Sequence, residues 1–326
     1  MISTRFTKQA KIELPIICGA MYPCSNPELV AAASEAGGIG IVQPLSLTYV
    51  HGHDFREGLR FIRSLTNKPY GVNIIVEQSS KTYENKMKKM LDIAIEEGCR
   101  FFITALGNPR WVVNQVKPYG GIVYHDVVNR KWALKGLEGG VDGFICVNNR
   151  AGGHAGVQSI EALYVSLKDL NIPLIATGGI GDENDVAYAL KLGYDGVQLG
   201  TRFIATKECH ESEAYKQAIL NAKEEDIVLT ERVTGIPLSV INTPYVQQMG
   251  TKAGPLARWM LQNRYTKRFM RFLYGIIALR DFKKISRGEG SSKNYWQAGK
   301  SCAHIQKVES VSEIMQRFAK AIHKNF

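Results

Sequence analysis

Short apolar runs alternate with longer segments of mixed polarity over the first 224 residues. Runs such as 142–147 and 173–178 are almost wholly apolar, which is typical of strands buried on both faces. The predicted strands are 14–18, 38–43, 70–76, 101–105, 121–125, 142–147, 173–178 and 196–200. Eight strands that alternate with helices favour a closed (β/α)8 TIM barrel over an open doubly wound sheet.

The intervening segments carry helix start and stop signals. Segment 26–37 begins with Asn26 and Pro27, a typical N-cap followed by proline at the first helical position. Asp182 and Gly193 similarly predict the two ends of another helix. The predicted helices are 26–37, 81–98, 127–139, 159–170 and 182–193.

The pattern changes after about residue 230, where the sequence becomes helical, basic and rich in aromatic residues. We therefore predict a (β/α)8 barrel over 1–235 and a small helical subdomain that covers the active site over 236–305. We assign 306–326 to the closing helix of the barrel. Its segment 311–323 places Ile314, Met315, Phe318, Ala319 and Ile322 on one face.

Composition narrows the classes of protein. An apolar content of 45% and a charged content of 22% are typical of a soluble globular protein, and no apolar run is long enough to span a membrane. The N-terminal segment lacks a signal-peptide pattern. Six cysteines without a CxxC motif disfavour structural zinc and disulfides, and favour reduced thiols in the cytoplasm. The net charge of +11 favours anionic partners, but no nucleic-acid-binding motif accompanies it.

Two glycine-rich loops follow the last two predicted strands: ATGGIGD at 176–182 and LGTRF at 199–203. Phosphate sites of barrels commonly form from these loops, because glycine allows the backbone N–H groups to approach an anion closely. Gly178, Gly179, Gly200 and Thr201 are the candidates. The structural alternative is that both loops are tight turns that need positive φ.

His154 lies in the loop NNRAGGHAG that follows the sixth strand, on the catalytic face of a barrel. There it would act as a general base or hydrogen-bond donor, or would be merely solvated. Asn73 would present its amide to a ring edge or would be a buried structural amide. His125 and Asp126 end the fifth strand and are further candidates for the site. No histidine has metal-ligand spacing, so we expect no metal.

Taken together, these segments resemble the nitronate monooxygenase family, formerly the 2-nitropropane dioxygenases, which includes FMN-dependent enoyl-ACP reductases and NADH:quinone reductases. The resemblance is carried by PIICGAM, GVNI, AGGHAG, ATGGIGD, GVQLGTRF and YWQAGKS in the family's order. It implies FMN as cofactor and His154 as the catalytic histidine. The implied cofactor-binding residues are Ala20, Met21, Tyr22, Asn73, Asp126, Gly153, Gly178, Gly179, Gly200 and Thr201, with Gly299 nearby.

The chain departs from the family pattern at positions that would face the substrate. Tyr22 stands where members often have glutamine, and Asp126 stands where some have lysine. Val147 and Arg150 occur where an acidic residue often precedes the histidine motif. These departures leave the implied flavin binding intact but bear on the substrate.

The leading functional hypothesis is oxidation of alkyl nitronates by O2 to a carbonyl compound and nitrite, with a small-molecule substrate. The alternative is an NAD(P)H-dependent reductase of an enoyl-ACP or a quinone. An anionic substrate or an acidic carrier protein would dock on the basic segment 255–290, which is otherwise interpreted as a solvated helix face. A third hypothesis is peripheral membrane binding through the same segment, without stable insertion. We expect a monomer or a homodimer.

Overall fold

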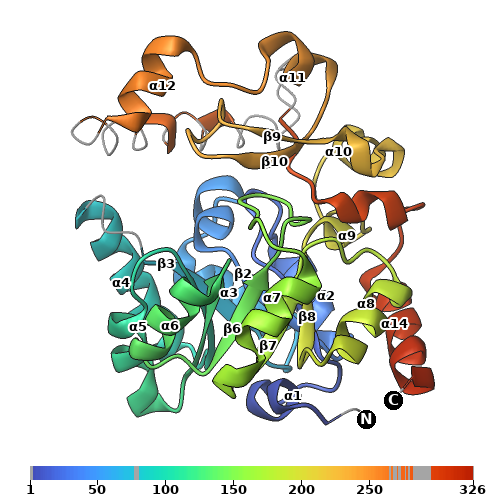
Figure 1. The fold of residues 1–326 in the computed structure, drawn as a ribbon. Coiled ribbons are helices and arrows are strands. Elements are labelled where there is room, and N and C mark those ends of the chain that lie inside the picture. The colour runs from blue at the N-terminus through green and yellow to red at the C-terminus, as the bar shows by residue number, and fades with distance from the viewer. Residues whose placement is uncertain are drawn as a thin grey trace.

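The computed structural model describes residues 3–76, 81–263 and 295–325, together with 266, 270, 273–275, 277, 280 and 281. Eight parallel strands close into a barrel because β1 pairs with both β2 and β8 (Figure 1). The predicted TIM barrel is confirmed. The strands are β1 (Ile16–Cys18), β2 (Ile39–Val42), β3 (Gly71–Ile75), β4 (Phe101–Ala105), β5 (Ile122–Val127), β6 (Gly143–Val147), β7 (Leu174–Thr177) and β8 (Gly196–Leu199).

Helices surround the barrel and bury their apolar faces against the strands. They are α2 (Pro27–Glu35), α3 (Phe55–Leu65), α4 (Lys81–Glu96), α5 (Arg110–Val116), α6 (Arg130–Glu138), α7 (Ile160–Leu167) and α8 (Glu183–Leu192). The amphipathic C-terminal helix α14 (Val311–Asn325) packs against α8 and α2, over the seam between β8 and β1. The π-helix η1 (Ser46–Val50), α3 and α5 were not predicted.

Helix ends follow the predicted signals with one difference. Asp182 accepts hydrogen bonds from the backbone of α8, and Gly193 ends that helix in the left-handed conformation, as predicted. Asn26 occupies the N-cap of α2 with Pro27 after it, but its side chain makes no capping hydrogen bond. Its amide donates instead to the carbonyl oxygen of Glu208, at 2.9 Å.

The barrel interior forms its own apolar core. Ile17, Ile41, Ile103 and Ile145 belong to it, and strand alternation sends their neighbours outward against the helices. The short helix α1 (Arg5–Ala10) closes the N-terminal end of the barrel. Phe6 of this helix is fully buried, and its ring centroid lies 5.8 Å from that of Phe101 and 5.7 Å from that of Tyr124.

A second layer covers the opposite, C-terminal end of the barrel strands (Figure 1). We call residues 227–263 the cap. It contains the antiparallel strands β9 (Ile227–Thr230) and β10 (Leu238–Ile241), and the helices α11 (Pro244–Met249) and α12 (Pro255–Gln262). The sequence did not predict this strand pair, because helical patterning dominates the surrounding segment. The chain between β8 and the cap forms α9 (Thr201–Ile204), α10 (Glu213–Asn221) and η4 (Glu224–Asp226), and all three contact η5 (Lys300–His304) from the C-terminal segment.

Candidate active site

A cavity of about 560 Å³ lies at the C-terminal ends of the barrel strands, where the loops and residues 297–301 meet. All of the residues predicted for the site contribute to its wall: Ala20, Met21, Tyr22, Asn73, Asp126, Gly153, His154, Gly178, Gly179, Gly200 and Thr201. The eight-strand order thus brings together residues that are far apart in sequence. Gly299 does not line the cavity but supports its wall from behind, as described below.

Strand alternation gives the cavity a polar layer of side chains on the barrel side. Ile41, Tyr124 and Ile175 face the apolar interior, so Gln43, Asp126 and Thr177 two residues later face the same way. The inner polar layer comprises Gln43, Asn73, Asp126, Thr177 and Gln198, and all five line the cavity. Gln43, Thr177 and Gln198 were missed by sequence reasoning, although the period of two along β7 and β8, and its continuation one residue past β2, would have identified them.

Part of the inner polar layer has no partner within the described protein. The Oδ1 atom of Asp126 and the Oε1 atom of Gln198 are buried without a hydrogen bond. Gln43 differs, because its Oε1 accepts a hydrogen bond from the Ser46 N–H at 2.6 Å. Buried polar atoms are normally hydrogen-bonded, so the unpaired ones indicate that the cavity receives a ligand with polar edges.

Asp126 and His125 have opposite orientations because they are consecutive strand residues. Burial raises the pKa of the Asp126 carboxyl to about 7. The imidazole of His125 lies on the outer face, where its Nδ1 is 2.8 Å from the Thr104 hydroxyl and its Cδ2 packs near Gly136 of α6. Burial lowers its pKa to about 4. His125 borders the cavity, but only Asp126 of the pair points its side chain inward, which corrects the expectation for His125.

The two glycine loops form one side of the cavity. Gly178 and Gly179 have φ values of 112° and 74°, so the prediction of positive φ in the first loop is correct. A Cβ at Gly178 would lie 2.2 Å from the Asn148 side chain, and one at Gly179 would lie 2.5 Å from that of Arg150. Glycine is therefore required here by both conformation and space, and the loop presents bare backbone to the cavity.

The second glycine loop is held by the C-terminal segment. Gly200 precedes α9 with a φ of −112°, so the positive-φ alternative is wrong for this loop. The hydroxyl of Thr201 accepts a hydrogen bond from the Gly299 N–H at 2.9 Å. Gly299 also lies against Gly152, where an added Cβ would meet backbone nitrogen at 2.6 Å. Close backbone contact between Gly152 and Gly299 fixes the position of the histidine loop relative to the phosphate-loop candidates.

His154 lies in the loop after β6 and is exposed beside the cap. Its Nε2 is 3.2 Å from the Thr234 hydroxyl, which itself donates to the carbonyl of Ile236 at 3.0 Å. Because that hydroxyl has one proton, His154 is the donor to Thr234. The neighbouring Gly153 carbonyl accepts from the Ser239 N–H of β10 at 2.8 Å. The cap therefore orients the histidine loop.

Arg150, noted as a departure in this loop, is paired away from the cavity. Its guanidinium makes two hydrogen bonds with the carboxylate of Glu224, at 2.7 and 2.8 Å. Lys300 approaches the same carboxylate at 3.3 Å. Among the described residues that line the cavity, there is no lysine or arginine.

The loop after β1 is fixed by serine and glutamine side chains. The Met21 N–H donates to the Ser25 hydroxyl at 2.9 Å, and the Ser46 hydroxyl donates to the Met21 carbonyl at 3.1 Å. The Gln297 amide donates to the Tyr22 carbonyl at 3.3 Å. Burial also raises the pKa of Tyr22, so its phenol is neutral. This part of the wall is rigid and uncharged.

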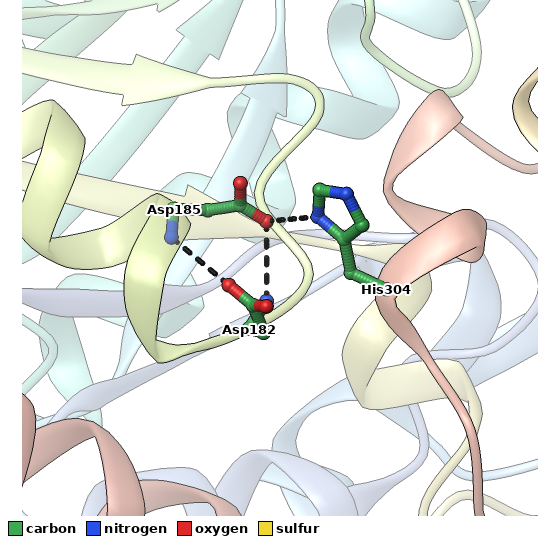
Figure 2. A group of neighbouring side chains, drawn as sticks. All are labelled: Asp182, Asp185 and His304. Atoms are coloured by element: carbon green, nitrogen blue, oxygen red, sulfur yellow. Dashed lines mark hydrogen bonds and ion pairs between the residues drawn. The ribbon is translucent and has the colours of Figure 1, made fainter.

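Figure 2 shows a cluster formed by Asp182, Asp185 and His304 outside the cavity. Asp182 caps α8, and Asp185 accepts from the Gly181 N–H at 2.8 Å and from His304 Nδ1 at 2.6 Å. These bonds account for the cluster as a helix cap joined to η5. They tie the first glycine loop to the C-terminal segment.

Most of the basic segment 255–290 lies outside the described residues, including Arg264, Lys267, Phe269 and Phe272. Within the described part, α12 begins at Pro255, and Trp259 is 59% exposed. No described helix combines the length and apolar character needed to cross a membrane. All six cysteines are buried and none forms a disulfide.

Comparisons with known proteins identify relatives over most of the chain. The family model described as nitronate monooxygenase matches residues 3–320. A probable nitronate monooxygenase from Staphylococcus saprophyticus is 27% identical over 81% of this chain and 86% of its own. The (3aS,4S,5R,7aS)-5-hydroxy-7a-methyl-1-oxo-octahydro-1H-indene-4-carboxyl-CoA dehydrogenase of Rhodococcus jostii is 30% identical over 76% of this chain and 68% of its own. The structure of FabK from Thermotoga maritima has a TM-score of 0.80 and 29% identity, covering 99% of this chain and 98% of its own.

Proposed function

Because this chain belongs to the nitronate monooxygenase family, we propose that it is an FMN-dependent enzyme that oxidises alkyl nitronates with O2 to a carbonyl compound and nitrite. The position of His154 carries this proposal. The predicted catalytic histidine borders the cavity, and the cap fixes its orientation through Thr234.

The cavity residues fit FMN in two respects. Gly178, Gly179, Gly200 and Thr201 would hold the phosphate through backbone N–H groups, because no side chain at the glycines obstructs an anion. Asn73 and Gln198 of the inner polar layer would pair with the polar edge of the ring. Ala20, Met21 and Tyr22 would lie along the ring by their backbone, with Asp126 and Gly153 also in contact. Bound FMN would supply the redox chemistry.

His154 would act on the substrate in one of two ways, as a base or as a cation. As a neutral imidazole it would remove the proton on the carbon next to a nitro group. As an imidazolium it would be a cation for a nitronate in a cavity whose described wall has no lysine or arginine. Both tasks need a ring held in one orientation, which the hydrogen bond to Thr234 supplies.

A second candidate is NAD(P)H-dependent reduction of an enoyl thioester or a quinone. Leu106 and Trp132 line the cavity and remain 57% and 43% exposed, so its entrance presents large apolar side chains. An apolar entrance and a wall without described lysine or arginine favour a neutral, hydrophobic substrate. The relative named as a carboxyl-CoA dehydrogenase gives further support for a thioester.

Anaerobic mixing of the purified, FMN-loaded protein with a nitronate, NADH and NADPH in turn would separate the two candidates. Bleaching of the flavin absorbance by propionate-3-nitronate alone, with O2 consumption in air, is the result expected for nitronate oxidation. Rapid bleaching by a nicotinamide, with no effect of nitronate, would instead assign the reductase. A protein that remains colourless after incubation with FMN would contradict both.

A further inference from the structure

Asp126 is the only carboxylate side chain among the described residues that line the cavity. It follows the inward-facing Tyr124 by two residues on β5, so it belongs to the inner polar layer. Its Oδ1 is buried and has no hydrogen-bond partner. An ionised carboxylate is strongly disfavoured in such a place unless it is paired, and burial accordingly raises the pKa of Asp126 to about 7.

The elements packed around β5 bring no compensating cation to this carboxyl. On β4 and β6, Ala105 and Val147 contribute apolar side chains to the same wall. The thiol of Cys146 on β6 is neutral because burial raises its pKa, and the imidazole of His125 is neutral and directed outward. His154 is the other histidine that lines the cavity, and the phenols of Tyr22 and Tyr215 are neutral because burial raises their pKa. The charged residues of α5 and α6, and Lys117 directly after α5, are exposed: Arg110, Lys117, Arg130, Lys131, Lys135 and Glu138.

We propose that Asp126 is a neutral carboxylic acid that donates a hydrogen bond from the inner polar layer to an acceptor atom on the ring of bound flavin. This inference rests on the flavin-binding part of the proposed function. A protonated carboxyl has one donor and retains acceptor capacity. The polar edge of the flavin carries carbonyl oxygens and unprotonated ring nitrogens beside a single N3–H, so a neutral acid can donate to these acceptors, whereas a carboxylate has no proton to donate to them.

The dependence of FMN affinity on pH provides the test, with Asp126→Asn as the matched variant. Asparagine keeps a donor of similar size but does not titrate. We expect wild type and D126N to bind FMN within about threefold of each other at pH 6, and wild type to bind roughly tenfold more weakly than D126N at pH 9. The FMN phosphate titrates in the same way for both proteins, so the ratio of their dissociation constants isolates Asp126.

A ratio that stays constant from pH 6 to pH 9 would overturn the proposal, as would tighter binding by wild type at pH 9. Infrared difference spectra between wild type and D126N, without FMN, add a readout independent of binding. They should show a protonated carboxyl band at pH 6 that disappears at pH 9. A carboxylate band already present at pH 6 would contradict a neutral Asp126.

Asp126→Leu removes the donor while keeping the number and branching of the side-chain heavy atoms. It should weaken FMN binding about tenfold at pH 6 relative to D126N. If D126L does not fold, as judged by circular dichroism, the comparison of wild type with D126N still decides whether Asp126 is a neutral donor. Because these measurements use FMN alone, the absence of nitronate oxidation would refute the proposed reaction without affecting this result.

Discussion

His154 of the barrel and Thr234 of the cap are 80 residues apart in sequence, and their side chains meet at 3.2 Å. The Thr234 hydroxyl is itself oriented by its bond to the Ile236 carbonyl. The tautomer and the direction of the imidazole are therefore set by a loop between β9 and β10, and not by the barrel alone. Residues remote from the reacting atoms should consequently influence the histidine.

Replacement of Thr234 by valine should lower kcat/KM about fivefold to tenfold, because a neutral hydrogen bond contributes roughly 1 kcal/mol. FMN affinity should remain unchanged, since Thr234 is not among the residues lining the cavity. Steady-state kinetics and an FMN titration measure the two effects. Thr234→Ser, which keeps the hydroxyl, is the control and should retain most of the activity. Equal rates for valine and serine variants would show that the hydrogen bond has no role.

His154→Ala should reduce kcat/KM for the nitronate by roughly 10²- to 10⁴-fold, the range for loss of a general acid–base group. The glycine loops are untouched, so the variant should still purify with flavin. A visible spectrum establishes the flavin content before oxygen consumption is measured. The exposed His323 of α14, replaced by alanine, serves as a control for histidine loss away from the cavity. Near-normal turnover in His154→Ala would exclude the assigned role.

Gly179→Ala should weaken FMN binding and destabilise the fold. The residue has φ 74°, and its Cβ would lie 2.5 Å from the Arg150 side chain. Gly120 is a matched control, because it has φ 72° but nothing within 4 Å of an added Cβ. Its φ of 72° and ψ of 20° are left-handed helical, so Gly120→Ala should cost only the backbone penalty of roughly 1–2 kcal/mol. Thermal denaturation and FMN titration of both variants separate conformational strain from the crowding at Gly179.

We expect the folded protein to lose stability in acid because of Glu309. Hydrogen bonds from Arg317, at 2.6 and 3.0 Å, are the main cause that lowers its pKa, with Arg202 adding to the effect. Because the folded pKa lies below the unfolded value, the carboxylate contributes fully above the unfolded pKa. That contribution is lost as the pH falls through the folded pKa.

The substitution Glu309→Gln should destabilise the protein by about 3 kcal/mol at neutral pH, since it breaks a buried ion pair. Melting temperatures of wild type and variant should converge as the pH is lowered through the folded pKa of Glu309. Glu138→Gln, at an exposed position, should follow the wild-type curve throughout. A Tm difference that is independent of pH would show that the ion pairs are not responsible.

The barrel could be predicted because its strands are buried on both faces and appear as apolar runs. The segment 101–105 was assigned with the bounds that β4 has, and the other strands differ by a few residues at most. The pair β9 and β10 was missed because the sequence around it was interpreted as helical, although the residues IVLT of β9 favour a strand. Helix α3 was missed although its start at Asp54 is a regular cap.

The sequence predicted the loops that line the site. It did not predict the whole inner polar layer on the barrel side of the cavity. Glycine and histidine motifs located Gly178, Gly179 and His154, which the closed barrel brings to one cavity. Gln198 was hidden within a motif that otherwise suggested a phosphate loop. The contact between His154 and Thr234 had no local signal, because it depends on how the cap packs on the barrel.

The wall of the cavity combines residues near the start of the chain with residues near its end. Met21 lines it early, whereas Gln297 and Ser301 come from the last thirty residues, and Gly299 secures Thr201 from behind. A ribosome releases these segments in order. The wall of the cavity therefore stays incomplete until residues 297–301 have been synthesised and Gly299 has packed against Thr201, so a ligand that needs the whole wall can bind only after that point.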